Sequence, residues 1–218
     1  ARHAVFAAVL VGNASLDDLA AGSAAVQDAL AGRDFGEATV TITGTPTQGQ
    51  TLTNTNSGEK RGILGGEDIT LDIGTLNNQH GYLGANKNLT LLASQIDNQH
   101  GMINSAATLD LTARGLNNQS GRLNAEHNLD IHLGSGMLNN QSGRLNAVHN
   151  LDIHLGLGNL NNSATDKHHT AGYILAGGRL WIKAQNLDNR RSKNTPQAAP
   201  GVAQGLHANH ILLDGQHI

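Results

Sequence analysis

The chain has 218 residues, of which 2% are aromatic and 14% are charged, while Gly occurs 27 times and Asn 24 times. So few aromatic side chains argue against an ordinary enzyme pocket, and a hydrophobic content of 38% argues against a disordered chain. The net charge of −3 gives no electrostatic basis for binding nucleic acid, the absence of Cys excludes disulfides, and no apolar run reaches the ~18 residues of a membrane span.

The N-terminal segment, residues 1–36, has two interpretations. Ser15 to Asp18 resembles a capping box that opens a helix ending near Gly32, with Leu19, Val26 and Leu30 on one face. Such a helix would cover an open end of a repeat fold. The alternative is that residues 1–36 are diverged coils of a longer rod. Residues 39–43 alternate polar and apolar side chains, which is typical of a strand in an early coil.

An internal repeat dominates the rest of the chain. Residues 116–134 and 138–156 are identical at 18 of 19 positions, and weaker copies start at residues 76, 96, 160 and 187, with a degenerate copy at residue 52. Successive starts are 24, 20, 20, 22, 22 and 27 residues apart. Repeats of this length indicate a solenoid, although the spacing of leucine-rich repeats and the helical period of ankyrin and tetratricopeptide repeats are absent.

Within a copy the period of the pattern is two. Leu129, Ile131 and Leu133 alternate with Asp130 and His132, as in a short strand with one buried face. A second short strand follows the glycine of each NQxG, and the Leu of each LNN marks a third. Three short strands per repeat predict an all-β solenoid, a parallel β-helix of roughly seven or more coils, that occupies residues 37–218.

Stacked coils place equivalent residues above one another about 4.8 Å apart. The paired asparagines would then form ladders at one corner, where Asn tolerates a left-handed backbone and its amide both donates and accepts hydrogen bonds. Recurring glycines mark a second tight corner. The predicted ladder residues are Asn77, Asn78, Asn98, Asn117, Asn118, Asn139, Asn140, Asn161, Asn162 and Asn189. Two coils carry insertions at the same corner, residues 163–171 and 190–204, which are tolerated surface loops or a binding face.

The repeated pattern of an Asn pair, a glycine and an LxL strand resembles the filamentous-haemagglutinin repeat over roughly residues 52–218. This resemblance implies the right-handed β-helical shaft of a two-partner-secretion exoprotein, a group that includes Gram-negative adhesins and the stick proteins of contact-dependent growth inhibition. It also implies export through an outer-membrane partner transporter and display at the bacterial cell surface. Neither the secretion-domain motif nor the VENN motif of the family is present, so we interpret the chain as an internal segment.

Two outward columns invite chemical interpretations. His127 above His149, and His132 above His154, stand beside carboxylates and suggest a metal site, but duplication of a coil copies any surface residue into a column without a ligand. We therefore predict no metal and no cofactor. The stacked carboxylates of Asp110, Asp130 and Asp152 suggest a carbohydrate-active enzyme, although sugar-cleaving grooves usually carry aromatic platforms.

Trp181 occupies the carboxylate column one coil later and is its one aromatic neighbour. We predict a binding patch, with ordinary surface or contact with an adjoining module as the alternative. Its residues are Tyr173, Trp181, Lys183, Asp152, His154, Arg190 and Arg191.

The resulting prediction is a structural and interaction protein without catalytic residues, namely a shaft segment used in adhesion or in presenting an effector to a neighbouring cell. Its expected partner is an unidentified receptor or glycan on a host or neighbouring cell, with no nucleic acid and no membrane span. The alternatives are a carbohydrate-active β-helical enzyme and a receptor-binding segment of the same class of exoprotein.

Overall fold

The computed structural model describes residues 5–10, 14–15, 39–44, 51–55, 63–65, 68–166, 168–190 and 204–217. Within these residues every regular element is a β-strand, and the strands form three parallel sheets. No helix among them is long and apolar enough to cross a membrane.

Among the described residues, each coil contributes at most one strand to each sheet. Sheet 1 contains β1 (Val5–Leu10), β3 (Thr39–Gly44), β6 (Ile69–Asp72), β9 (Leu89–Leu92), β12 (Leu109–Thr112), β15 (Leu129–His132), β18 (Leu151–His154), β21 (Arg179–Lys183) and β24 (His210–Asp214). Sheet 2 contains β2 (Ala14–Ser15), β4 (Thr51–Thr53), β7 (Thr75–Asn77), β10 (Gln95–Asp97), β13 (Gly115–Asn117), β16 (Leu138–Asn139), β19 (Asn159–Asn161) and β22 (Asn186–Asp188). Sheet 3 contains β5 (Ile63–Gly65), β8 (Tyr82–Ala85), β11 (Met102–Ser105), β14 (Arg122–Ala125), β17 (Arg144–Ala147), β20 (Tyr173–Ala176) and β23 (Gly205–His207).

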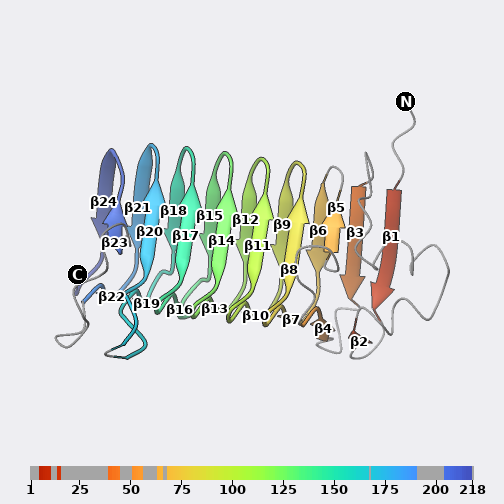
Figure 1. Ribbon diagram of the computed structural model, residues 1–218, viewed down its shortest axis with the longest axis horizontal. Helices are drawn as coiled ribbons and strands as arrows, with labels where there is room; N and C mark the ends of the chain where they lie inside the picture. Colours follow the sequence, from red (N-terminus) through yellow and green to blue (C-terminus); the bar gives the residue numbers. More distant parts are fainter. Residues whose placement is uncertain are drawn as a thin grey trace.

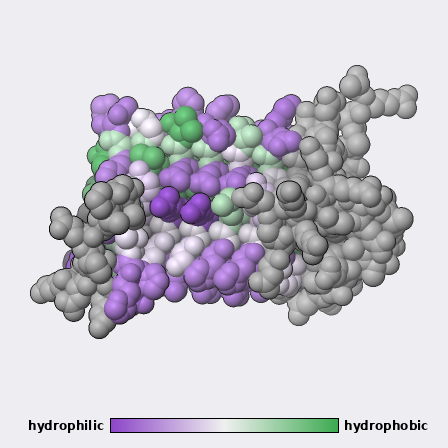
Figure 2. All heavy atoms as spheres, viewed as in Figure 1, coloured by the Kyte–Doolittle hydropathy of each residue, from purple (hydrophilic) through white to green (hydrophobic). Residues whose placement is uncertain are grey.

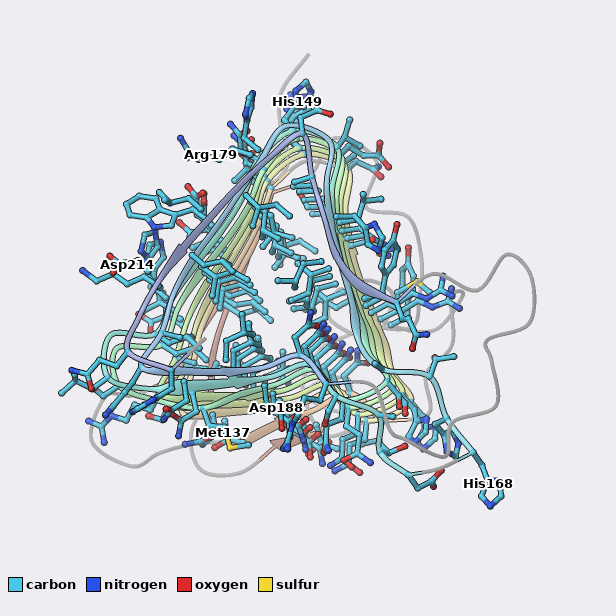
Figure 3. All side chains as sticks on the ribbon, turned by 90° about the vertical axis from the view of Figure 1, so that its left-hand side faces the viewer. Met137, His149, His168, Arg179, Asp188 and Asp214 are labelled. Atoms are coloured by element: carbon cyan, nitrogen blue, oxygen red, sulfur yellow. The ribbon has the colours of Figure 1, made fainter. Side chains whose placement is uncertain are left out.

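The predicted parallel β-helix is confirmed. Figure 1 shows the coils stacked side by side along one axis, and seven coils from β3 to β23 have all three strands described. Viewed along that axis the cross-section is a triangle, with one sheet on each side (Figure 3). The chain runs counter-clockwise in Figure 3 as it advances toward the viewer, from His149 at the apex past His168 to Arg179, so the helix is right-handed.

Alternation along each strand separates the core from the surface. In β15 the side chains of Leu129 and Ile131 are fully buried, whereas His132 is exposed. The pairing register places each inward residue on its equivalent one coil away, as with Leu129 and Leu151. Continuous rows of Leu, Ile and Ala therefore fill the interior. At the C-terminal end of the described stack the side chains are less buried than in the middle. No described strand pairs with the far edge of β24, and Leu212 is 52% exposed.

The asparagine pairs and the recurring glycines were predicted at two different corners, but both lie at the corner between sheets 2 and 3. The asparagines were expected to adopt the left-handed backbone, but among the described non-glycine residues positive φ angles of 52–53° occur at His80, His100, Ser120 and Ser142. The glycine that follows each of these residues is required for another reason. A Cβ at Gly121 would lie 2.1 Å from the backbone oxygen of Asn98, so the coils stack too closely for any side chain.

The N-terminal strands extend two of the sheets. β1 pairs in parallel with β3, and β2 pairs in parallel with β4. Apart from Ser15 at the end of β2, the predicted helix between Ser15 and Gly32 falls on residues 16–32, which lie outside the described residues.

We expect Gly121→Ala to destabilise the protein by roughly 2–3 kcal/mol, since the methyl group would also lie 2.6 Å from Oδ1 of Asn118. Gly134→Ala is the matched control. Gly134 has a φ of +63° and no atom within 4 Å of an added Cβ, so only backbone strain of about 1 kcal/mol is expected. Urea unfolding followed by circular dichroism measures both losses. Equal losses would show that close stacking does not require the glycine.

Candidate functional site

The second asparagine of each pair points into the interior and forms a ladder along the whole stack. Each Nδ2 donates to Oδ1 of the equivalent asparagine one coil further on, at 2.7–2.8 Å. The ladder runs through Asn54, Asn78, Asn98, Asn118, Asn140, Asn162 and Asn189, and all but the last are buried. A polar row thus lies inside a core whose other buried side chains, apart from Ser105, are apolar among the described residues.

The hydrogen-bonding capacity of this inner ladder is largely filled. Besides its bond to Asn118, Nδ2 of Asn98 contacts the backbone oxygens of Gly101 at 3.4 Å and Arg122 at 3.2 Å. A buried amide is costly when its donors or acceptors are unpaired. The ladder is therefore stable only while every coil contributes an asparagine, which indicates a structural role.

The first residue of each pair lies on the outside. Oδ1 of Asn117 accepts from the backbone N–H of Gln119 at 3.1 Å, a local turn bond that repeats along the stack. The same bond is made by Asn77, Asp97, Asn139, Asn161 and Asp188. The two residues of a pair therefore have different roles. The first stabilises the turn, and the second forms the hydrogen-bonded ladder in the interior.

Four residues of the predicted binding patch meet on the outer face of sheet 1. The register of β18 and β21 sets Asp152 beside Trp181, and His154 beside Lys183. The ring of His154 stacks on His132 with centroids 5.0 Å apart, and contacts the ring of Trp181 edge-on at 4.8 Å. This face combines an aromatic ring, imidazoles and charged groups.

Arg179, which is not among the predicted patch residues, contacts two members of this cluster. Its guanidinium donates to both carboxylate oxygens of Asp152, at 3.1 and 2.8 Å, and lies 5.9 Å from the centroid of the Trp181 ring. Figure 3 shows Arg179 and Asp214 on this same side of the triangle. The ion pair holds Asp152 in place as a hydrogen-bond acceptor. Nε1 of Trp181 is buried and has no partner among the described residues.

The pKa values of Asp130 and His154, on the outer face of sheet 1, are shifted by burial and by neighbouring charges. Burial raises the pKa of Asp130, and the neighbouring carboxylates of Asp152 and Asp110 raise it further. Burial also lowers the pKa of His154, with a second contribution from the charge of His132. Within the part of the chain that the structure describes, no group of three His, Asp or Glu side chains is arranged to hold a metal ion.

The remaining residues of the predicted patch lie elsewhere. Tyr173 is on sheet 3, where its ring contacts His207 edge-on at 5.2 Å. Arg190 follows sheet 2 and forms an ion pair of 2.9 Å with Asp188. Arg191 lies outside the described residues. The described residues of the patch are thus distributed over separate faces of the triangle.

The inserted loop after Asn162 is held against the stack at its base. Oγ of Ser142 donates to the backbone oxygen of Thr170 at 2.7 Å. Further out, Asp166 lies 2.7 Å from the ring of His169, and this hydrogen bond lowers the pKa of Asp166. His168 projects from this corner (Figure 3). The loop therefore adds an exposed polar projection to the triangle.

A groove on sheet 3 was not predicted. It has a volume of about 680 Å³ and crosses β8, β11, β14, β17 and β20. Figure 2 looks onto this face and shows hydrophilic side chains gathered along its middle. The floor carries a second row of asparagines, Asn104, Asn124 and Asn146. The repeated RLNA segments were the available signal, because alternation places Arg and Asn on one outer face.

Comparison with known proteins adds one finding. The sequence model of the haemagglutinin repeat family matches residues 65–132 and 124–216, which together exceed half of the chain. No curated protein and no solved structure matches the chain.

We expect Asn118→Ala to destabilise the protein by roughly 2–4 kcal/mol, because it removes the ladder bond of Asn98 Nδ2 and leaves Oδ1 of Asn140 without its ladder donor in the interior. Asn117→Ala, which removes only the turn bond to Gln119, should cost about 1 kcal/mol. Urea unfolding of the two variants gives the comparison. A smaller loss in Asn118→Ala than in Asn117→Ala would contradict the structural role of the inner ladder.

We expect Asp130→Asn to stabilise the protein at pH 7. The folded-state pKa of Asp130 lies above its ordinary value of 3.8, so the protonated form favours folding. The stability that protonation provides is fully present below pH 3.8 and is lost as the pH rises through the folded-state pKa. A neutral amide removes this loss, so the melting temperatures should differ at pH 7 and converge at about pH 3. A variant that melts below the unsubstituted protein at pH 7 would contradict the assignment.

Proposed function

Because the chain belongs to the haemagglutinin repeat family, we propose that it is a shaft segment of a large secreted bacterial surface protein that mediates adhesion or contact between cells. The observation that carries this proposal is the unbroken pairing of equivalent strands from coil to coil in all three sheets.

The proposed mechanism is mechanical. Each coil contacts its neighbours through three sets of backbone hydrogen bonds, rows of buried Leu and Ile, and the inner asparagine ladder. In such a stack length grows linearly with the number of coils, by about 4.8 Å each. The shaft sets how far a terminal module reaches, and side chains on its faces supply contacts along the way.

Export and partners follow from the same proposal. An outer-membrane partner transporter would release the chain unfolded, and each coil would then fold on the edge of the coil before it, since neighbouring repeats stabilise one another. The absence of cysteine removes the hazard of disulfide formation before export. At the cell surface the shaft would either bind a receptor or glycan of another cell itself, or present an effector module in contact-dependent inhibition.

The shaft proposal is tested by adding one coil. Spin labels are attached to Asn86→Cys and Val148→Cys, exposed turn positions in a chain with no other cysteine. Duplication of residues 116–137 should lengthen the distance between the labels by about 4.8 Å, measured by double electron–electron resonance. A flexible Gly/Ser insertion of equal length after Ser135 is the control, and it should loop out without lengthening the stack. An unchanged distance in the duplicated chain would refute a shaft.

The surface role has its own measurement. Beads coated with the chain should be retained by cells, and free chain should compete for this retention in a concentration-dependent way. A parallel incubation with acidic polysaccharides tests the enzymatic alternative. Cleavage that disappears in Asp130→Asn and Asp152→Asn would replace the shaft proposal with a carbohydrate-active enzyme.

A further inference from the structure

We propose that the groove on sheet 3 binds a linear, carboxylate-bearing glycan that lies parallel to the axis of the β-helix. The inference deepens the proposed surface role by naming the chemical class of the partner. It stands on three observations: a row of unsaturated amides on the floor, two guanidinium groups beside it that form no ion pair with any described residue, and a repeat distance that suits sugars.

The floor of the groove has hydrogen-bonding capacity to spare. Nδ2 of Asn146 donates to Oδ1 of Asn124 at 2.9 Å, and Nδ2 of Asn124 donates to Oδ1 of Asn104 at 2.7 Å. Each amide has two N–H donors and two acceptor lone pairs, and these bonds use only one donor of each. Unlike the inner ladder, the outer row makes no second bond from its Nδ2 atoms to backbone oxygens within the described residues.

The two ends of the row are built differently. At one end Nδ2 of Asn104 donates to the hydroxyl of Tyr82, whose ring lies over the vacant side-chain position of Gly84. At the other end the equivalent residue is Leu175, and Oδ1 of Asn146 is buried without a partner among the described residues. An unpaired buried acceptor is costly, and a ligand hydroxyl that donates to it would remove this cost. The row therefore offers donors along its length and an acceptor at its end, which suits a polyhydroxylated ligand.

Arg122 and Arg144 flank the floor on the same outer face, two residues before Asn124 and Asn146 in their strands. The register pairs them on adjacent coils. Neither guanidinium makes an ion pair with any residue that the structure describes. Because Arg binds carboxylates through paired N–H donors, two such groups one coil apart favour a ligand with repeated carboxylates.

The spacing favours a glycan over a peptide. The asparagines of three successive coils, and the arginines of two, lie about 4.8 Å apart along the axis. An extended peptide advances about 3.3 Å per residue and loses register with the coils within a few residues. One pyranose ring in an extended glycan is about as long as one coil is thick, so successive sugars meet successive amides.

The test is calorimetric titration of the 218-residue chain with an oligogalacturonate long enough to cross the groove. A neutral gluco-oligosaccharide and polyglutamate of equal length are the comparison ligands. We expect the oligogalacturonate to bind. The neutral ligand should bind at least about tenfold more weakly, because it loses the charge-assisted hydrogen bonds. Polyglutamate should also bind at least about tenfold more weakly, because its shorter repeat does not match the spacing of the coils. Asn124→Leu, and the double variant Arg122→Gln with Arg144→Gln, should each weaken binding about tenfold.

Arg114→Gln is the control, because it makes the same substitution and removes one positive charge at an exposed position between sheets 1 and 2. It should leave the affinity unchanged, and circular dichroism checks that every variant folds. No binding of the oligogalacturonate, equal binding of polyglutamate, or unaltered affinity in Asn124→Leu overturns the proposal. The spin-label distance is independent of this result. A chain that lengthens by one coil but binds no glycan remains a shaft and loses only the groove.

Discussion

The stacking of equivalent residues at the spacing of β-strands is the constraint on which the rest of the structure depends. Every position in a coil meets its own copy above and below, so any group placed at a buried position must be compatible with itself. Leu and Ile satisfy this condition through van der Waals contact. Among polar side chains an amide is well suited, because it carries a donor and an acceptor and can pair with an identical neighbour. The buried row from Asn54 to Asn162 is the consequence.

The same constraint explains the composition of the chain. At the corner where the glycines lie, the backbone oxygen of the preceding coil comes so close that a Cβ at Gly101 would be 2.2 Å from the oxygen of Asn78. Asparagine and glycine are therefore abundant because each coil requires them at fixed places. Rings are nearly absent from the described interior because three short sheets enclose a narrow core of Leu, Ile and Ala.

The sequence predicts the fold well because near-identical copies reveal the period, the alternation and the corners together. It does not separate the two asparagines of a pair, since Asn117 and Asn118 are adjacent and of one type, and only the direction of each side chain distinguishes turn from interior. Sites are harder to predict. Tyr173 and Trp181 are eight residues apart, but they belong to different sheets. The groove is not predictable from the repeat, because a duplicated coil copies Arg122 and Asn124 into columns whether or not they bind anything.

Because a duplicated coil repeats every residue, the recurrence of a side chain says little about its function. The number of its hydrogen-bond donors and acceptors that remain unused is more informative. The inner and outer rows are both asparagine ladders with bonds of similar length. They differ in what remains after the ladder is formed. Asn118 also reaches two backbone oxygens, so its amide donors are occupied. Asn124 keeps an unused donor and lies half-buried on the floor of a groove. A saturated row holds coils together and offers a ligand no free donor. An unsaturated row, beside cations that form no ion pair within the described part of the chain, retains the capacity for recognition.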